Sequence, residues 1–434
     1  MRKFLRKILK RLARLTVWKY NPEVIGVTGS VGKTSAKEAI FAVLANRSRS
    51  ALIEREKWQI RKSEGNLNNE LGVPLVILGD WGKRDLNLVS RSQPAGTRKA
   101  AKAFFWLKVI LIGAWETVFH SSRYPKILVL EYGADRPGDL KYLLKIVRPK
   151  IGVVTAVGET PVHIEFYENA EEVAKEKSKL IENLPAGGYA ILNYDDDLVL
   201  NMKNKTRAQI LTFGFDENAN IIISNFENRM EEKRPEGVSF KIEYQGNIIP
   251  VALKNVFGKA QAYSAAAAFS VGVIHGMNLV EIAELLEKYY SPAKHRMNLI
   301  EGVKDTWIID DSYNASPLSM KEALSTLGSL EAERKIAVLG DMLELGKYSI
   351  EEHGGIGKMA AGIADILITV GPRGKFIAEA ANLSRMAKKN IFAFDTVDEA
   401  KKHIQNIIHS GDLILIKASR AIGLDKAVDE IKKM

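Results

Sequence analysis

The feature that most constrains the fold is a glycine-rich loop between a predicted strand and a predicted helix. Residues 24–27 form a short apolar run, residues 33–44 have helical character, and residues 26–34 read GVTGSVGKT. In this context backbone N–H groups turn onto phosphate oxygens, and the helix N-terminus adds partial positive charge. We therefore expect Lys33 to neutralise nucleotide phosphates and the Thr34 hydroxyl to bind Mg²⁺. The expected nucleotide contacts here are Thr28, Gly29, Ser30, Gly32, Lys33, Thr34 and Ser35.

Apolar runs alternate with helical stretches along the rest of the chain. The predicted strands are 127–131, 151–156, 189–192, several short strands within 210–254, and then 307–310, 336–339, 366–370, 391–394 and 413–416. This alternation favours mainly parallel sheets with helices on both faces. The predicted fold class is α/β, with a P-loop central domain and a C-terminal Rossmann-like α/β domain. The expected boundaries are 1–22 for an N-terminal helix, 23–291 for the ATP-binding domain with an insertion at about 81–126, and 292–434 for the last domain.

Composition excludes some kinds of site and suggests a kind of partner. The 434 residues include no cysteine, which rules out disulfides, thiolate metal sites and cysteine nucleophiles and fits a cytoplasmic protein. The formal charge of +11 indicates a polyanionic partner such as a nucleotide or an acidic membrane face. Because no nucleic-acid-binding motif accompanies this charge, we expect no nucleic-acid partner.

Two segments, one basic and one apolar, have alternative interpretations. The first twenty residues carry eight basic side chains and no acid, with apolar residues at helical spacing. They predict an amphipathic helix that either packs on the next domain or lies peripherally on the inner face of an anionic membrane. Residues 104–119 form an apolar run that contains Lys108 and Glu116. This run is shorter than the ~20 apolar residues that span a bilayer, so it predicts a buried or interfacial helix.

Several further segments carry a family resemblance. They are residues 65–75 (GNLNNELGVPL), 131–138 (EYGADRPG), 310–317 (DDSYNASP), 339–346 (LGDMLELG, followed by His353) and 417–420 (KASR). Together with the loop, they resemble the Mur ligase family and most closely its D-alanyl-D-alanine-adding branch. The resemblance implies an ATP-dependent ligase that joins a carboxylate to an amine through an acyl phosphate. The expected reaction adds D-alanyl-D-alanine to a muropeptide in peptidoglycan precursor synthesis.

The resemblance also implies roles for individual residues. Thr34, Glu131 and His163 would hold Mg²⁺, and Lys177 would be carbamylated to bridge a second Mg²⁺. Lys33, Lys177 and Arg296 would serve catalysis, with Arg296, Asp311 and Asn314 contacting ATP and Asn68 and Asn69 contacting the substrate. Lys175 and Lys179 compete with Lys177 for the match. Glu131 ends an apolar strand, where a carboxylate reaches the carboxyl edge of a sheet.

Two departures from the family pattern keep other functions open. Ala260, Gln261 and Ser264 stand where the family often has His and Asn residues near adenine, and only 25 residues precede Gly26, too few for the domain that holds a uridine nucleotide. One alternative is a Mur-like or polyglutamate-type synthetase with another acceptor. The other is a membrane-associated P-loop ATPase without ligase activity.

Overall fold

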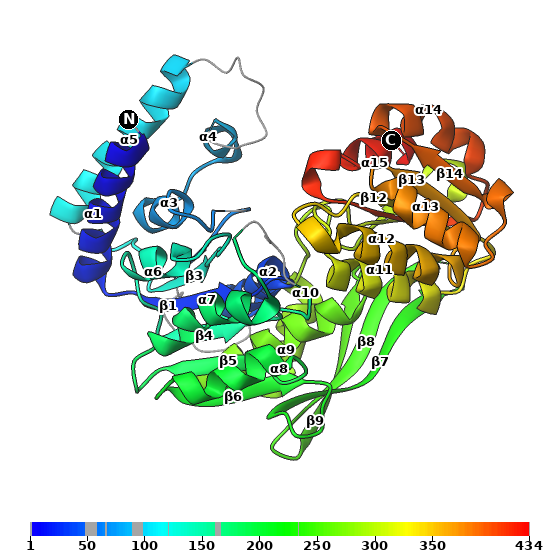
Figure 1. Ribbon diagram of the computed structural model, residues 1–434. Coiled ribbons are helices and arrows are strands. Elements are labelled where there is room, and N and C mark those ends of the chain that lie inside the picture. The colour runs from blue at the N-terminus through cyan, green and yellow to red at the C-terminus, as the bar shows by residue number, and fades with distance from the viewer. Residues whose placement is uncertain are drawn as a thin grey trace.

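A computed structural model describes residues 2–47, 59–65, 67–88, 99–119, 121–160, 166–232 and 234–433. Within these residues the chain builds two sheets, each covered by helices on both faces (Figure 1). The predicted α/β class with mainly parallel sheets is therefore confirmed. The exact domain boundaries stay a prediction; the two sheets lie on opposite sides of residue 292 in the sequence.

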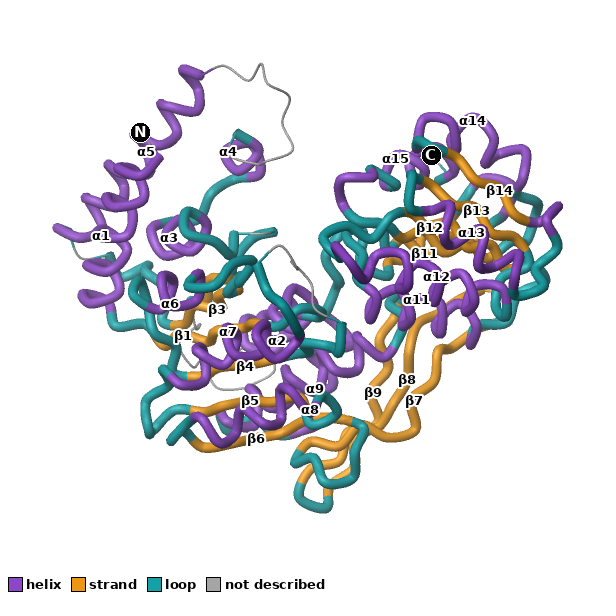
Figure 2. Tube along the Cα trace, in the orientation of Figure 1, coloured by secondary structure: helices purple, strands orange, loops and turns teal. Residues whose placement is uncertain are grey.

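The first sheet has nine strands among the described residues, in the order β2-β3-β1-β4-β5-β6-β7-β8-β9. Their bounds are β1 (Glu23–Thr28), β2 (Ile60–Lys62), β3 (Ile127–Glu131), β4 (Ile151–Val154), β5 (Tyr189–Asn193), β6 (Gln209–Gly214), β7 (Ile221–Glu231), β8 (Arg234–Tyr244) and β9 (Asn247–Lys254). Strands β2 to β7 pair in parallel, and β7, β8 and β9 pair antiparallel. The antiparallel end extends toward the second sheet (Figure 2).

Three helices cover one face of this sheet and bury the largest apolar core. They are α2 (Lys33–Asn46), α9 (Lys259–Ile274) and α10 (Leu279–Tyr289). Runs of small alanines let α9 lie close to α2, with Ala265, Ala266 and Ala268 fully buried. The helix predicted at residues 33–44 is confirmed as α2.

The opposite face carries helices from three parts of the chain. They are α1 (Arg2–Tyr20), α3 (Gly72–Leu78), α4 (Lys83–Asn87), α5 (Lys99–Val118), α6 (Asp139–Leu144), α7 (Ala170–Glu182) and α8 (Asp197–Leu200). The first twenty residues are thus helical, as predicted, and the 104–119 run falls almost entirely in α5. No helix in the described residues is long and apolar enough to cross a membrane.

The second sheet has six strands in the described C-terminal residues, in the order β10-β11-β15-β12-β13-β14. The strands are β10 (Asn298–Glu301), β11 (Trp307–Asp310), β12 (Lys335–Gly340), β13 (Ile366–Val370), β14 (Ile391–Phe394) and β15 (Leu413–Lys417). Helices α11 (Pro317–Ser329), α12 (Ser349–Ala361) and α13 (Gly374–Leu383) cover one face, and α14 (Val397–Ile407) and α15 (Asp425–Ile431) the other. Short 3-10 helices occur at Asn201–Lys205, Val303–Asp305, Gly346–Tyr348, Lys388–Asn390 and Arg420–Ile422.

One strand boundary differs from its prediction for a local reason. The predicted strand 151–156 ends at Val154. The next residues turn onto the glycine-rich loop, because Ala156 forms an isolated antiparallel bridge with Val31 instead of continuing β4. The end of β4 therefore helps to shape the loop.

Candidate active site

The glycine-rich loop is anchored on the neighbouring strand. Ser30 N donates to Ala156 O at 2.5 Å, and Thr155 Oγ1 donates to Val31 O at 2.5 Å. Gly29 has φ +147°, and a Cβ at this position would collide with Thr155 Oγ1. The loop path therefore requires glycine at position 29, for both conformation and space.

The loop leads into the N-terminus of α2. Gly32, in the left-handed region at φ 87°, precedes the helix and gives no side-chain cap. Helix N-termini with free N–H groups attract phosphate. Ser30 Oγ is buried and has no hydrogen-bond partner among the described residues. A buried hydroxyl without a partner costs free energy, and a phosphate oxygen in the loop would satisfy it. The loop therefore fits a nucleotide phosphate.

Lys33 lies over this loop. Its Nζ donates to Gly29 O at 2.7 Å and to Ser30 O at 3.1 Å. Burial lowers the pKa of Lys33, while the nearby Glu131 carboxylate opposes that effect and the charge of Arg296 adds to it. A half-buried cation held by carbonyl oxygens at the loop is suited to pair with phosphate charge.

A compact polar cluster adjoins the loop. Thr34 Oγ1 donates to Glu131 Oε2 at 3.0 Å, and Asn68 Nδ2 donates to Glu131 Oε1 at 3.0 Å. Glu131 is 2% exposed, at the end of β3. The structure thus brings together three predicted site residues from α2, β3 and the segment before α3. Hydroxyl and carboxylate oxygens are ligands that Mg²⁺ accepts, so this donor set fits the ion.

Lys37 belongs to the same cluster and was missed in the sequence analysis. Its Nζ lies 4.0 Å from Glu131 Oε2 and donates to Ser63 O at 2.5 Å, and its side chain is fully buried. The Ser63 hydroxyl accepts a hydrogen bond from Glu131 N at 3.1 Å. The available signal was its spacing, since Lys37 lies one helical turn after Lys33 and therefore on the same face of α2.

Lys177 is the buried lysine of the three candidates on α7. It is 2% exposed, whereas Lys175 is exposed and Lys179 is half-buried and pairs with Glu176. Burial, together with the smaller effect of the Lys33 charge, lowers the pKa of Lys177 to about 7. A neutral amine is the form that reacts with carbon dioxide to give a carbamate. Carbamylation would convert this neutral amine into a negatively charged group near Lys33.

The C-terminal sheet supplies a second group of charges. Lys417 Nζ contacts the Asp311 carboxylate and donates to Asn314 O at 3.0 Å. Burial raises the pKa of Asp311, and the Lys417 charge opposes that rise. The Arg296 guanidinium lies 4.2 Å from the centre of the Tyr313 ring. Asp311, Asn314 and Arg296 therefore gather around the carboxyl ends of β11 and β15.

The two halves of the candidate site face each other and are in contact nearby. Thr160 Oγ1 donates to Glu352 Oε1 at 2.6 Å, and Asn228 Nδ2 donates to Ser329 Oγ at 2.8 Å. The charge of Arg296, in the C-terminal half, contributes to the lowered pKa of Lys33 in the loop. The arrangement can thus present cations from both halves to one polyphosphate.

Some predicted site residues have other partners. Thr28 Oγ1 donates to Tyr132 O at 2.9 Å, so this side chain stabilises the strand end. Asn69 Oδ1 accepts from Leu71 N and Gly72 N at the start of α3. Gln261 Oε1 accepts from the Tyr290 hydroxyl at 2.5 Å. Ser35 is buried beside Tyr290.

The remaining predicted metal ligand, His163, lies outside the described residues. Within the described part of the chain no three His, Asp or Glu side chains gather at a metal-binding distance. Thr34 and Glu131 are therefore the predicted ligands whose geometry is defined.

The loop at residues 339–346 is held by buried groups. His353 Nε2 accepts from Met342 N at 2.9 Å, and burial lowers the pKa of His353, which favours this neutral acceptor form. Asp341 Oδ1 accepts from Arg373 N and Gly374 N. These bonds fix the loop beside β15, where Ser419 N donates to Asp341 O.

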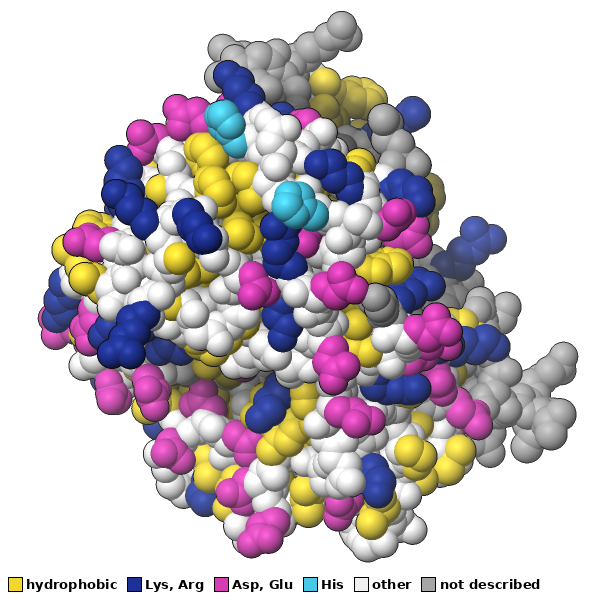
Figure 3. Space-filling view, turned by 90° about the vertical axis from the view of Figure 1, so that its right-hand side faces the viewer, with side chains coloured by type: hydrophobic (Ala, Val, Ile, Leu, Met, Phe, Trp, Pro, Cys, Tyr) yellow, Lys and Arg dark blue, Asp and Glu magenta, His cyan; other side chains and the backbone are white. Residues whose placement is uncertain are grey.

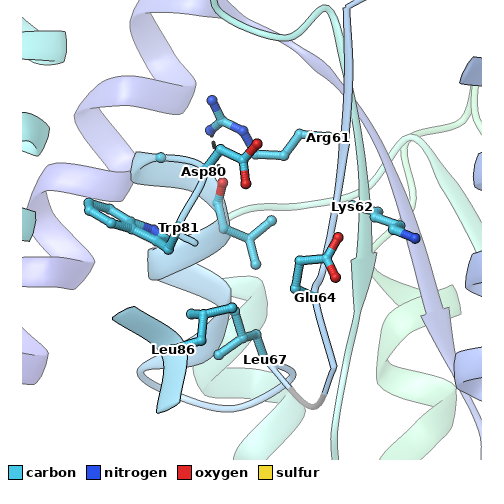
Figure 4. A pocket seen from close by; sticks show the side chains of 9 residues that line it. Arg61, Lys62, Glu64, Leu67, Asp80, Trp81 and Leu86 are labelled. Atoms are coloured by element: carbon cyan, nitrogen blue, oxygen red, sulfur yellow. Dashed lines mark hydrogen bonds between the residues drawn. The ribbon is translucent and has the colours of Figure 1, made fainter. Parts of the chain in front are cut away.

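A small hollow between β2 and α3 lies beside the site and has a structural explanation (Figure 4). Its volume is about 10 Å³, which suits no more than a water. Arg61 Nη1 donates to Val76 O at 2.9 Å and Ile77 O at 3.0 Å, and so satisfies carbonyls at the end of α3. We assign no ligand to this hollow.

Two family comparisons agree with this architecture. The Mur ligase middle domain matches residues 112–272, and the Mur ligase glutamate ligase domain matches residues 295–420, so together they cover about two thirds of the chain. The chain belongs to the Mur ligase family. This Mur ligase is thus an ATP-dependent peptide ligase by family, which confirms the enzyme class predicted from the sequence.

Individual relatives point to one branch of the family. The UDP-N-acetylmuramoyl-tripeptide–D-alanyl-D-alanine ligase of Bacillus subtilis strain 168 is 29% identical over 425 residues, covering 98% of this Mur ligase and 79% of the relative. The enzyme of the same name from Mycobacterium tuberculosis strain H37Rv is 28% identical, over 94% of this chain and 72% of the relative. The predicted resemblance to the D-alanyl-D-alanine-adding branch is confirmed.

Solved structures also indicate similarity to the D-alanyl-D-alanine-adding branch. MurF from Acinetobacter baumannii matches with a TM-score of 0.75 at 26% identity, over 98% of this Mur ligase and 80% of that chain. MurF from Thermotoga maritima in complex with ADP matches with a TM-score of 0.74 at 26% identity, over 98% and 83%. A Mycobacterium tuberculosis folylpolyglutamate synthase shares the fold, with a TM-score of 0.64 at 15% identity, over 97% and 95%.

Proposed function

We propose that this Mur ligase adds D-alanyl-D-alanine to the terminal carboxylate of a muropeptide, using ATP. The observation that carries the proposal is the cluster of Thr34, Glu131 and Asn68 beside the glycine-rich loop, in which Thr34 and Glu131 are buried. The relatives named for this reaction match nearly the whole chain.

The reaction proceeds in two steps, phosphoryl transfer and then acyl transfer. A carboxylate oxygen of the muropeptide attacks the γ-phosphorus of ATP, the bond to ADP breaks, and an acyl phosphate forms. The amine of D-alanyl-D-alanine then attacks the acyl carbon, the C–O bond to phosphate breaks, and the amine loses a proton. Phosphoryl transfer depends on positioning and on charge stabilisation around the γ-phosphate.

The loop and its lysine act on the phosphates. Backbone N–H groups at the N-terminus of α2, Ser30 Oγ and Lys33 Nζ hold the β- and γ-phosphates, and Arg296 approaches from the C-terminal half. Arginine suits this position because its planar fork pairs with two phosphate oxygens. Thr34 and Glu131, with the predicted ligand His163, would hold Mg²⁺, which would supply further neutralisation of phosphate charge.

Neighbouring residues orient these groups. Asn68 and Lys37 hold the Glu131 carboxylate from two sides, and Lys37 also limits the negative charge of the cluster. Asp311 and Asn314 keep Lys417 at the nucleotide side of the C-terminal sheet. Lys177, once carbamylated, gives a carboxylate suited to a second Mg²⁺, and Asn68 and Asn69 face the muropeptide.

A product assay tests the proposal. Purified protein is incubated with ATP, Mg²⁺, UDP-N-acetylmuramoyl-tripeptide and D-alanyl-D-alanine, and phosphate release and product mass are measured. The expected product is the acceptor plus the dipeptide less one water, with one phosphate per bond. Product with folyl or polyglutamate acceptors and glutamate, and none with the muropeptide, would instead support the synthetase alternative. ATP turnover independent of any amine would support the ATPase alternative.

The cytoplasmic location and the peripheral contact with the membrane face stay predictions from the sequence. The catalytic proposal does not depend on either of them.

A further inference from the structure

Helix α5 exposes a continuous apolar stripe. Its outward side chains follow helical spacing and are large: Phe104 (71% exposed), Leu107 (52%), Leu111 (60%), Trp115 (62%) and Val118 (71%). The opposite face of α5 packs on the protein, since Phe105 and Val109 are buried in the core over α3. The exposed stripe is therefore not needed to pack α5 on the protein. Contiguous exposed apolar surface of this kind marks an interaction site.

Helix α1 exposes cations interleaved with apolar side chains. Leu9, Ala13 and Thr16 are buried on its inner face, so the helix packs on the protein as one sequence interpretation expected. Its outward face nevertheless carries Lys3, Lys7, Arg11 and Arg14 together with Phe4, Leu15 and Trp18. Trp18 is 82% exposed. The inner face thus fits the packing interpretation, and the membrane interpretation of the outer face stays a prediction.

The two helices form one surface. At their C-terminal ends Lys19 Nζ donates to Glu116 O at 2.9 Å and to Phe119 O at 2.6 Å, and Tyr20 OH donates to Glu116 Oε2 at 2.8 Å. Both helices contact α3, and they lie side by side along the left edge of Figure 1. We refer to residues 2–20 and 99–118 together as the α1–α5 surface.

The charge of this surface is almost entirely positive. Helix α1 has eight basic residues and no acid, and Glu116, the sole acid in the α5 sequence, is bonded to Tyr20. The opposite side of the molecule differs, because acidic and basic side chains are interspersed across it (Figure 3). Anionic lipid headgroups complement a basic surface, and acyl chains complement the aromatic and aliphatic stripe.

We propose that the α1–α5 surface binds the face of an anionic lipid bilayer, with the α5 stripe at the acyl boundary and the α1 cations on lipid phosphates. A second copy of the chain fits this surface less well, because the two sets of α1 cations would face each other without acids. The helices lie in the interface, since none of those described is long and apolar enough to span a bilayer. This inference is independent of the ligase reaction.

Vesicle sedimentation with the full chain tests the proposal. We expect binding to phosphatidylglycerol-containing vesicles and not to pure phosphatidylcholine, with loss at high salt. The triple variant Leu107→Glu/Leu111→Glu/Trp115→Glu should abolish binding. A matched control places the same change at exposed apolar residues elsewhere, Val280→Glu/Ile350→Glu/Leu383→Glu, and should bind as the parent does.

A charge series tests the contribution of the α1 cations, and a fluorescence signal tests that of the α5 stripe. Lys3→Glu/Lys7→Glu/Arg11→Glu should weaken binding roughly 100-fold or more, because each basic residue near an anionic surface contributes appreciably. Lys388→Glu/Lys389→Glu/Lys402→Glu, at exposed sites on the C-terminal half, is the control for net charge. Brominated lipids should quench tryptophan emission, and Trp115→Phe should reduce that quenching.

Three outcomes would overturn the proposal. They are no binding to anionic vesicles at low salt, undiminished binding of the stripe variant, and a lipid-free dimer in analytical ultracentrifugation that the stripe variant dissociates. The stripe variant should keep its ligase activity on a water-soluble acceptor, because the α1–α5 surface lies outside the catalytic cluster. Failure of lipid binding is therefore distinguishable from failure of the proposed reaction.

Discussion

The Thr34 hydroxyl donates a hydrogen bond of 3.0 Å to Glu131, although 97 residues separate the two in sequence. The bond follows from sheet topology. Strands β1 and β3 are parallel neighbours, and Val27, near the end of β1, pairs with Glu131, the last residue of β3. The loop that follows β1 and the carboxylate that ends β3 therefore meet at one sheet edge, where ligands bind in such folds.

Lys33→Ala should lower ATP turnover by ~10²–10³-fold, since it removes electrostatic stabilisation of the transferring phosphoryl group. The fold should persist, as shown by an unchanged circular dichroism spectrum. Lys175→Ala, at an exposed lysine, is the control and should be active. Near-normal turnover of a folded Lys33→Ala variant would contradict the assignment of the loop.

Glu131→Gln should weaken Mg²⁺-dependent activity by ~10–100-fold or more, because the side chain keeps its size and loses its charge. The measurement is a Mg²⁺ titration of phosphate release, in which the requirement should shift to higher concentration. His163→Ala should act in the same direction. Glu171→Gln, on the exposed start of α7, should match the parent enzyme. An unchanged titration for Glu131→Gln would remove this residue from the metal site.

Lys177→Ala should lose activity and regain part of it with added short-chain carboxylates that replace a carbamate. Mass spectrometry after trapping the carbamate should find the modification at Lys177 and not at Lys175 or Lys179. Full activity of Lys177→Ala would show that the family match at this position is coincidental.

The pH dependence of carbamylation should follow the lowered pKa of Lys177, about 7. The neutral amine predominates above that value, so carbamate formation should rise as pH increases through 7 and fall below it. Removing bicarbonate should lower activity most on the alkaline side of this range, where the carbamate forms. The measurement is activity against pH with and without bicarbonate. Activity that is independent of bicarbonate at every pH would contradict the role.

The C-terminal half should close further onto ATP. Arg296 stands between His295 (φ 63°) and Met297 (φ 54°), two non-glycine residues in the left-handed region. Such backbone costs of order 1–3 kcal/mol and is common at switch positions. Small-angle scattering should show compaction with a non-hydrolysable ATP analogue and acceptor, and less with Arg296→Ala. Equal dimensions with and without ligand would argue against closure.

The elements with strong apolar patterns were predictable from the sequence, whereas elements defined by pairing were not. Strands β3, β11, β13 and β14 begin and end where predicted, since their cores are continuous apolar runs. Strand β2 was missed because Ile60–Lys62 has only three residues, two of them basic. Strand β10 was missed because its short Asn298–Glu301 sequence is flanked by polar ends and depends on antiparallel pairing with β11.

The candidate site shows the same division. Thr34 and Glu131 were found because a motif and a strand end mark them. Lys37 was missed, since a lysine inside a helix ordinarily lies at the surface, and its burial depends on Ser63 from a distant segment. Asn69 was assigned to the substrate, while its side chain also caps the start of α3, a local function that motif matching does not reveal.

The short connection between α1 and the phosphate loop would fix the distance of that loop from a membrane bound by α1. Asn21 and Pro22 alone separate α1 from β1, and the six residues of β1 lead directly to the loop. A strand of six residues is ~20 Å long and rigid within a sheet. If α1 lies on a bilayer, the loop is held at a stand-off set by this strand. An acceptor anchored in the same bilayer would then need a spacer of comparable length, so spacer length would become a criterion by which the enzyme selects its substrate.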